Sequence, residues 1–388
     1  MRFLKEKNDL IKIGLLGFFA LLTCQYYTYL YFRKEVATPA VYTHYLFNYQ
    51  DEFVKRGLVG EILRQLGFQM SHDVFYILAY SIFFLVCISL IIAITYPFRG
   101  YWRSTGCLLF FLFVFFHPGT IQHFHSDFGR TDGINLILTL LCLFLVSKIR
   151  KPYINIPICL LMIIVILIHE ATLFMYVPLV LAFSFYLDSS KENVLQLVIL
   201  ASILLLTTYI VSTHGLVKNS TLEQHYTKLK NMYGACIEED SAYEICVRHD
   251  TVAILHDRGI KKNINLVIDL IKNKSTNVKK THKRIFILLW PTFLIYILLI
   301  YEEIKRNGYS KKLLVFVAAL GPLALYPLAY DFSRWWALAV TNLIVSTALI
   351  AGTDHRFRNL LISFFYRYQI LVVIAIAISV KLGPLQLI

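Results

Sequence analysis

Residues 74–96 read VFYILAYSIFFLVCISLIIAITY, and this run contains no charged side chain. A helix needs roughly 20 apolar residues to cross the hydrocarbon core of a bilayer, so the run is long enough to span a membrane. Similar apolar runs recur along the 388-residue chain, and hydrophobic residues make up 57% of it. The sequence therefore predicts an all-α, polytopic membrane protein with a single integral membrane domain over residues 1–388.

Eleven spans are predicted from these runs. The first follows a charged N-terminal stretch and lacks a small-residue cleavage site after it, so we expect a retained signal anchor. No internal repeat is evident, which disfavours an inverted-repeat transporter. The predicted spans are residues 10–32, 74–96, 101–117, 132–149, 153–169, 171–187, 194–214, 285–302, 313–329, 335–352 and 368–387.

Lysine and arginine residues set the predicted orientation, with the N-terminus inside. The formal net charge is +14, and much of the excess falls in one alternating set of connections, whereas the short turns on the other side hold Arg130 and Arg334. We therefore attribute the charge to membrane topology and expect no nucleic-acid partner. A bacterial inner (cytoplasmic) membrane is the expected location. The basic inner connections lie within residues 2–12, 99–103, 148–151, 191, 305–312 and 356–367.

The first predicted outer loop, residues 33–73, contains NYQDEFVKRGLVGEILRQL at positions 48–66. Its apolar side chains recur at helical spacing. This pattern predicts a short amphipathic helix that lies in the membrane interface, with the acidic pair Asp51–Glu52 at its start. The side chains of the apolar face are Val54, Leu58, Ile62 and Leu66.

A second outer loop, residues 215–284, is rich in Lys, Asn and Glu. Helices are expected near residues 221–233 and 260–273. A segment of this length with few aromatic residues buries little core alone, so we expect a cap that rests on the membrane domain. If the loop faces an oxidising compartment, Cys236 and Cys246 are expected to form a disulfide, and two free thiols are the alternative.

Uncommon ionisable residues gather at the predicted outer side. Such groups are costly at the hydrocarbon boundary and usually face a cavity or one another. All of these residues are predicted to lie on the same side of the membrane, and this common location is the main functional signal in the sequence. The candidate residues are Asp51, Glu52, Arg56, His125, Asp127, Arg130, Asp132, His169, Glu170, Asp331 and Arg334, with His214 at the end of another predicted span.

Each group has a structural alternative. Asp51 and Glu52 would be favourable at a helix N-terminus without any catalytic role. Arg130 and Arg334 would serve packing if they pair with Asp132 and Asp331, or would bind a phosphate or diphosphate. The alternating His123, His125 and Asp127 form a weak metal motif without further spaced ligands, so hydrogen bonding is the favoured interpretation and no cofactor is expected. His169–Glu170 would cap a tight helical hairpin or line a site.

Several common motifs are missing. There is no Walker loop, no G-x-G-x-x-G after a strand, no G-x-S-x-G and no H-E-x-x-H. ATP-driven transport, dinucleotide chemistry and the common hydrolase designs therefore lose support.

The Asp51–Glu52 pair in the first outer loop, followed by an interfacial helix, resembles the arrangement of GT-C type glycosyltransferases. The outer charged clusters and the large outer loop are also similar to bacterial O-antigen and exopolysaccharide polymerases. The resemblance implies transfer of saccharides from polyprenyl-phosphate carriers at the outer face of the membrane. It implies that Asp51 or Glu52 is the base and that Arg130 and Arg334 bind the carrier diphosphate. From the residues themselves we also expect Arg56 to bind phosphate. We expect His169 and Glu170, a pair without a counterpart in these families, to orient the substrate. It leaves open the choice between a polymerase and a single-sugar transferase.

Two other function classes remain. A transporter or flippase for a lipid-linked or anionic solute would require charges deep in several spans and on both sides of the midplane, whereas the predicted span interiors are nearly free of charge. A structural or assembly subunit would tolerate the loss of the outer clusters.

Overall fold

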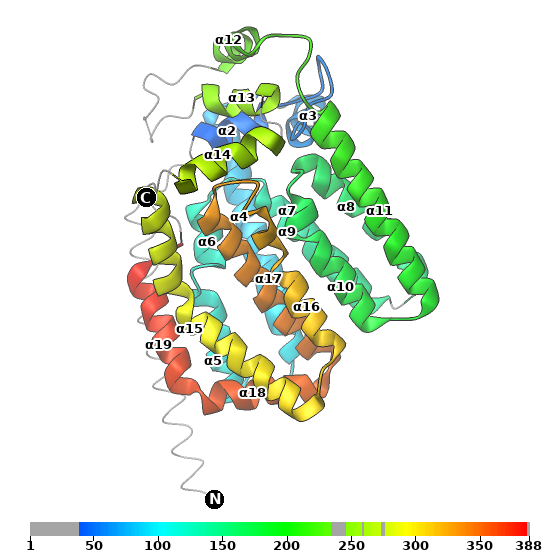
Figure 1. The fold of residues 1–388 in the computed structure, drawn as a ribbon, viewed down its shortest axis with the longest axis vertical. Helices are drawn as coiled ribbons and strands as arrows, with labels where there is room; N and C mark the ends of the chain where they lie inside the picture. Colours follow the sequence, from blue (N-terminus) through cyan, green and yellow to red (C-terminus); the bar gives the residue numbers. More distant parts are fainter. Residues whose placement is uncertain (1–38, 150, 234–245, 258–259, 273–275, 386–388) are drawn as a thin grey trace, which may run out of the picture.

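The computed structural model describes residues 39–149, 151–233, 246–257, 260–272 and 276–385. Throughout these ranges the regular elements are helices, without a strand, so the all-α prediction is confirmed (Figure 1). The elements are α2 (Pro39–Tyr45), α3 (Leu58–Gln65), α4 (His72–Thr95), η1 (Tyr96–Phe98), α5 (Thr105–Phe116), α6 (Ile121–Ser126), α7 (Asp132–Lys148), η2 (Pro152–Ile154), α8 (Asn155–Ile168), α9 (Thr172–Met175), α10 (Val177–Leu187), α11 (Lys191–His214), α12 (Leu222–Tyr233), α13 (His249–Asp257), α14 (Ile260–Lys272), α15 (Thr276–Asn307), α16 (Lys311–Ala319), η3 (Gly321–Leu325), α17 (Phe332–Thr353), α18 (His355–Arg367) and α19 (Gln369–Leu382).

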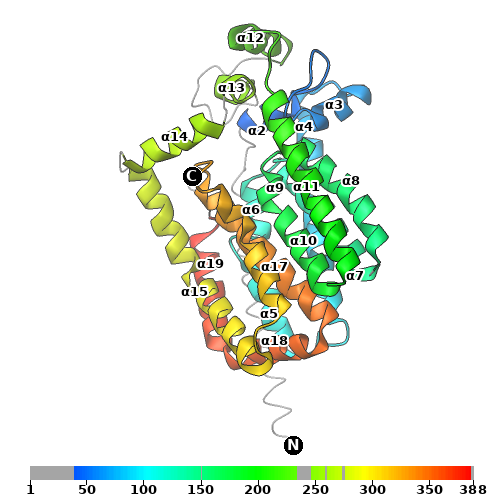
Figure 2. The ribbon, with the colours of Figure 1, turned by 45° about the vertical axis from the view of Figure 1, so that its right-hand side comes forward.

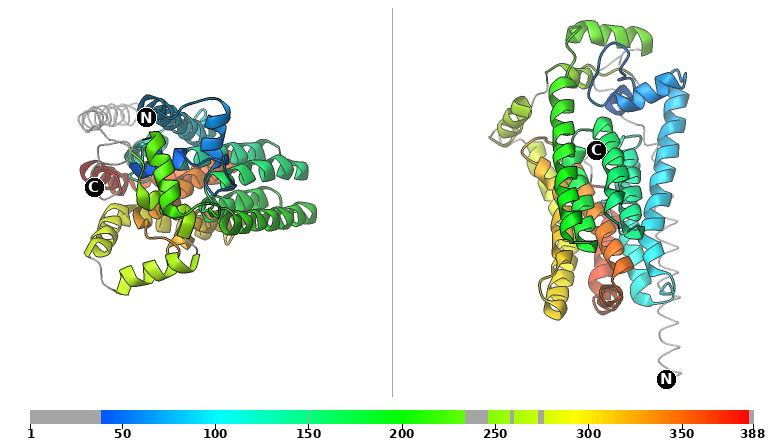
Figure 3. Two further views of the ribbon diagram at one scale, coloured as in Figure 1. Left: turned by 90° about the horizontal axis from the view of Figure 1, so that it is seen from above. Right: turned by 90° about the vertical axis from the view of Figure 1, so that its right-hand side faces the viewer.

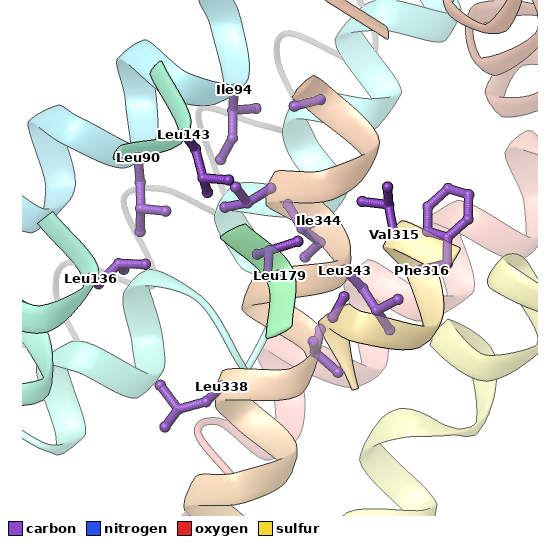
Figure 4. Close-up of a cluster of buried hydrophobic side chains, with 14 of the residues drawn as sticks. Leu90, Ile94, Leu136, Leu143, Leu179, Val315, Phe316, Leu338, Leu343 and Ile344 are labelled. Atoms are coloured by element: carbon purple, nitrogen blue, oxygen red, sulfur yellow. The ribbon is translucent and has the colours of Figure 1, made fainter. Parts of the chain in front are cut away.

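Helix α17 is the centre of the bundle. It is buried along almost its whole length and packs against α4, α15, α16 and α18. Figure 4 shows Leu338, Leu343 and Ile344 of α17 among apolar side chains from neighbouring helices. Several buried polar side chains of α17 donate hydrogen bonds to backbone carbonyls: Asn342 Nδ2 donates to Met175 at 2.7 Å, and Ser346 Oγ donates to Asn342 at 2.6 Å. A helix that is buried on nearly all sides lies in the core of the protein, and α17 occupies that place.

Several described helices are long and apolar enough to cross a membrane, as expected for a multi-pass membrane protein. Five qualify singly, and a sixth would be the α18–α19 pair, which is bent by 77°. The predicted span 10–32 lies outside the described residues, and the count of eleven stays a prediction. The single helices are His72–Phe98, Thr105–Ser126, Lys191–His214, Val278–Asn307 and Phe332–Thr353.

Some helix boundaries differ from those predicted. The predicted span 313–329 is a nine-residue helix, α16, followed by the 3-10 turn η3. Pro322 lacks the N–H that would continue the helix, and this explains the break. Helix α15 begins at Thr276 rather than near residue 285. Its first turns carry no apolar period, so the last part of the predicted cap loop was not recognisable as helix from the sequence.

The first loop and the cap share a second apolar core. Tyr42, Tyr45 and Val54 are buried together with Leu229 of α12 and Leu255 of α13. Figure 2 shows α12 and α13 stacked above α2 at one end of the bundle, and the right panel of Figure 3 shows α12 (green) at the same end. The predicted cap helices correspond to α12 and α14, whereas α13 was not predicted. The cap is therefore held to the rest of the chain through the first loop.

Helix α3 turns an apolar side outward. Ile62 is 48% exposed and Leu66 is 66% exposed, whereas Glu61 is buried and pairs with Arg64 at 2.7 Å. The Arg64 guanidinium holds the pKa of the Glu61 carboxyl at about 2. Val54, predicted to share the apolar face, is instead part of the second core. An exposed apolar side of this kind is what an interfacial helix presents to lipid.

Candidate functional site

A cavity of about 990 Å³ lies where the first loop, the cap and the ends of several bundle helices meet. This size falls within the range of small-molecule and cofactor sites. The cavity collects charged residues from segments that are far apart in the sequence. Its ionisable lining residues are His44, Lys55, Arg56, Arg130, His169, Glu170, Tyr209, Asp250, Tyr330, Asp331 and Arg334.

Arg56 and Glu170 form a bidentate ion pair across this cavity. Arg56 Nε donates to Glu170 Oε2 at 3.0 Å, and Nη2 donates to Oε1 at 2.7 Å. The third guanidinium nitrogen, Nη1, lies 3.4 Å from Nε2 of His44. Burial is the main reason that the pKa of His44 lies well below 6.5, and the charge of Arg56 lowers it further. The neutral imidazole therefore suits the role of acceptor for Arg56.

Arg56 also has an unusual backbone conformation, with a φ of 63°. Non-glycine residues seldom adopt this left-handed region, and such strain often occurs at functional sites. Gly57 follows directly and leaves space for Tyr49, because a Cβ at position 57 would lie 2.5 Å from that ring. The turn at Arg56–Gly57 directs the guanidinium into the cavity and toward Glu170.

A second charged group joins the starts of α7 and α17. Arg334 donates from Nε and Nη2 to Asp132 at 2.5 and 2.6 Å, and both side chains are buried. Asp331 Oδ2 lies 3.4 Å from Nη1 of Arg334 and 3.2 Å from Nη1 of Arg130. Asp127 lies behind Arg130, with Oδ1 2.6 Å from Nε. The carboxylates fix the directions of the two guanidinium groups.

The charges in this region nearly cancel. Arg56, Arg130 and Arg334 contact Glu170, Asp127, Asp132 and Asp331. Attraction of an anionic ligand would therefore depend on oriented N–H groups more than on net positive charge. Planar guanidinium groups that are already held in place suit phosphate oxygens.

The apolar wall of the cavity includes Leu205 and Tyr209 of α11. Both side chains are more than half exposed, and α11 has the length and composition of a membrane span. If α11 crosses the membrane, this side of the cavity borders the lipid phase. Leu173, Phe174 and Leu328 extend the apolar lining toward the charged end. The cavity thus combines a charged end with an apolar side, as a lipid-linked anion would require.

The structure brings together six of the eleven predicted site residues, because Arg56, Arg130, His169, Glu170, Asp331 and Arg334 all line this cavity. Asp127 and Asp132 contact its arginines directly. His125 instead packs against the Phe83 ring, with 5.5 Å between the ring centroids. No group of three His, Cys, Asp or Glu residues that would hold a metal is found in the described part of the chain.

Asp51 and Glu52, the predicted base and its alternative, line a second cavity of about 450 Å³. Asp51 Oδ2 lies 2.5 Å from Nζ of Lys228 on α12. The Glu52 carboxylate accepts hydrogen bonds from the backbone N–H groups of Lys218 and Asn219, at 3.0 to 3.1 Å. Both acidic residues therefore connect the first loop to the cap, and their catalytic role stays a prediction.

The candidate residues chosen from the sequence did not include His44, Lys55 and Asp250 of the first cavity, and Trp335 was expected mainly at the membrane interface, with sugar binding as a secondary role. Lys55 is adjacent to the selected Arg56, and Trp335 is adjacent to Arg334, so sequence proximity was an available signal for both. His44 lies in YTHYLFNY, a segment without a recognisable period. Cys246 is in a disulfide, and Cys236, its predicted partner, lies outside the described residues.

The cap carries a histidine pair that predicts a pH effect. His225 Nδ1 of α12 lies 3.0 Å from His256 Nε2 of α13. Burial, aided by the charges of His256 and Lys228, lowers the pKa of His225 to about 4, and burial also lowers that of His256. As the pH falls from 6.5 toward 4, the histidines become protonated in the unfolded state, whereas His225 stays neutral in the folded state. The cap should therefore lose stability in this window.

Hydrogen exchange of α12 and α13 would test this expectation. Protection, corrected for intrinsic exchange, should be lower at about pH 5 than at about pH 7. At the lower pH a histidine is protonated in the opened state, and this protonation favours opening. A His225→Gln variant keeps a hydrogen-bonding side chain without this titration, and its protection should depend less on pH. Equal pH dependence in both proteins would contradict the assignment.

Comparison of the chain with protein-family models, with curated proteins and with solved structures finds no match.

Proposed function

We propose that this chain is a membrane glycosyltransferase that takes saccharides from polyprenyl-phosphate or -diphosphate carriers in surface-polysaccharide synthesis. The observation that carries the proposal is the convergence of Arg56, Arg130 and Arg334 on one cavity, one side of which includes exposed apolar residues of α11. A phosphate group bound by the arginines would leave its lipid tail free to extend along α11 into the bilayer. The proposal includes eleven spans and an outer-facing site in a bacterial inner membrane.

The residues of the cavity suit this chemistry. The acceptor hydroxyl gives its proton to a carboxylate, and its oxygen forms the new bond to the anomeric carbon. The bond between that carbon and the phosphate oxygen breaks, and its electron pair stays on the leaving phosphate. Oriented guanidinium N–H groups stabilise the charge that develops there. His169 and Glu170 border the same space and would orient the sugar.

Three carboxylates are candidates for the base: Asp51 and its alternative Glu52, which line the second cavity, and Asp331, which lines the first. Asp331 lies in the first cavity between Arg130 and Arg334, at 3.2 and 3.4 Å. Asp51 lies in the second cavity, and its side chain is 62% exposed beside Lys228. The choice among them depends on which cavity receives the reacting hydroxyl.

Cells that lack the chain and are resupplied with variants would test both the function and the base. Asp331→Asn, Asp51→Asn or Glu52→Gln, whichever removes the base, should lower transfer by about a hundredfold or more, as loss of a general base does. Polyprenyl-linked intermediates should then accumulate in the membrane and be detected by mass spectrometry. Asp73→Asn alters an exposed carboxylate outside both cavities and is the matched control.

The pattern of the remaining glycan distinguishes the two forms of the reaction. A lost chain-length ladder with single repeat units left on the carrier indicates a polymerase. Loss of one sugar from each repeat indicates a single-sugar transferase. Unchanged glycans and unchanged lipid intermediates in cells without the chain would contradict the glycosyltransferase proposal.

One observation favours the alternative, a transporter or flippase of lipid-linked or anionic solutes. Lys312 is buried and pairs with Glu303 and Asp354, each at 2.6 Å, where α15, α16 and α18 meet. The charged cavity residues lie elsewhere, among the first loop, the cap and the start of α17. Charges at separate places in the bundle suit a transport path. However, Asp354 also caps α18 through the backbone N–H groups of Arg356 and Phe357, which gives the cluster a structural role.

A further inference from the structure

The second cavity has a different character from the first. Side chains from the first loop and from α12 line it, and many of them carry both donors and acceptors of hydrogen bonds. Asp51, Glu52, Arg64 and Lys228 supply charges of both signs in equal number. The other polar lining residues are Tyr45, Asn48, Gln50, Asn219, Ser220, Gln224, His225 and Tyr233.

A thin wall separates the two cavities. Three pairs of consecutive residues line the two sides: Lys55, Leu216 and Ile254 face the first cavity, and Val54, Val217 and Leu255 face the second. Two backbone hydrogen bonds, each of 2.9 Å, join these segments of the chain: the Lys55 N–H donates to the Gly215 carbonyl, and the Val217 N–H donates to the Leu255 carbonyl. Gly215 allows this close approach, because a Cβ there would lie 2.7 Å from the Lys55 nitrogen.

We propose that the second cavity binds sugar units of the acceptor saccharide, beyond the reacting hydroxyl, an inference that rests on the proposed function. A neutral saccharide presents many hydroxyl groups and no net charge. A lining with mixed charges, amides and hydroxyls satisfies such a ligand and gives little preference to an anion. The one-residue wall places this site directly beside the cavity that would hold the activated donor.

Further contacts in the second cavity suit a saccharide. Phe68 is 52% exposed and lines it together with Tyr233, so aromatic surface is available for the apolar face of a sugar ring. Gln224 accepts a hydrogen bond from the Thr221 backbone N–H at 2.9 Å, which fixes the direction of its amide. Lys228 is held by Asp51. Polar groups that are already oriented reduce the entropy lost when a ligand binds.

A filled-cavity variant tests the site. Asn219 lines the second cavity, whereas its neighbour Lys218 lines neither cavity. Both residues are exposed, and both donate a backbone N–H to Glu52. Asn219→Trp should therefore fill the cavity, and Lys218→Trp is a control with the same added side chain and the same backbone anchor.

The experiment uses the full chain in lipid nanodiscs. The probe is a pool of fluorescently labelled oligosaccharides that mild acid releases from the surface glycan of the host. Asn219→Trp should weaken binding of this pool by about tenfold or more, because the indole occupies the space of the ligand. Lys218→Trp should bind the pool as the wild type does. Thermal unfolding of both variants should match that of the wild type.

A second measurement separates this inference from the proposed function. Transfer of sugar from host polyprenyl lipids onto the same oligosaccharides should show a raised acceptor KM and an unchanged donor KM for Asn219→Trp. Failure of the wild type to bind the pool, or equal binding by Asn219→Trp, would overturn the saccharide site. In a further outcome, the wild type binds the pool and Asn219→Trp abolishes that binding, while the wild type shows no transfer activity. This result would support the saccharide site and refute the proposed transferase.

Discussion

Replacing Arg334 with methionine is expected to destabilise the protein by about 3–5 kcal/mol, because Asp132 would remain buried without its partner. The Arg334 side chain is 8% exposed and that of Asp132 is 3% exposed, and two hydrogen bonds of 2.5 and 2.6 Å join them. Asp331 keeps Arg130 as a second cation, so most of the loss falls on Asp132. Thermal and denaturant unfolding of the detergent-solubilised protein would measure the change.

A double variant separates the structural role of this pair from its proposed role in binding. In Arg334→Met with Asp132→Leu, apolar side chains replace both charges, and such replacements of buried ion pairs are often close to neutral in stability. We expect stability to return toward the wild-type value while sugar transfer stays lost. Recovery of transfer together with stability would show that Arg334 serves packing alone. A stable single variant would show that Asp132 is solvated or protonated in the folded protein.

The sequence predicts the positions of the long helices well. The predicted spans 74–96, 194–214 and 335–352 each coincide with one helix, α4, α11 and α17. Apolar runs of this length have few alternatives to a membrane helix or a buried helix. The Gly321–Pro322 dipeptide indicates the break after α16, but a prediction from hydropathy alone does not detect it. The polar first turns of α15 had none.

Part of the first cavity could be predicted from the sequence, and the reason is physical. Residues next to the ends of apolar runs must lie at one end of the bundle or the other, so the orientation assigns Arg130, Glu170 and Arg334 to one place. Their convergence on one cavity agrees with that reasoning. The directions of the side chains within the first loop could not be predicted in this way. Asp51 and Arg56 are close in sequence, yet the left-handed turn at Arg56 sends them into different cavities. No residue type signals that turn.

The second large effect is expected at Arg56. Substitution by lysine should lower kcat/KM for sugar transfer by about a hundredfold, comparable to the removal of one donor that stabilises charge in a transition state. Lysine keeps the positive charge, and Lys55 already supplies another ammonium group to the same cavity. It cannot reproduce the two parallel N–H bonds that Arg56 makes with Glu170. The variant therefore tests geometry at nearly constant charge.

Glu170→Gln provides the companion variant. The amide keeps one acceptor oxygen but loses the charge and the second acceptor, so Arg56 should be held less firmly in the cavity. If the pair acts as one unit, the double variant should lose little more activity than Arg56→Lys alone, and the double-mutant cycle should show coupling of at least about 1 kcal/mol. Additive losses would show that the two residues contact the substrate separately.

A control at the neighbouring position makes the result specific. Lys55→Arg replaces the neighbouring ammonium group with a guanidinium and keeps the positive charge in the cavity. It leaves the Arg56–Glu170 pair in place, so transfer should stay within about threefold of wild type. Equal and large losses for Arg56→Lys and Lys55→Arg would indicate a general disturbance of the first loop. Full activity of Arg56→Lys would remove the guanidinium from the proposed phosphate site, because a cation alone would then be sufficient.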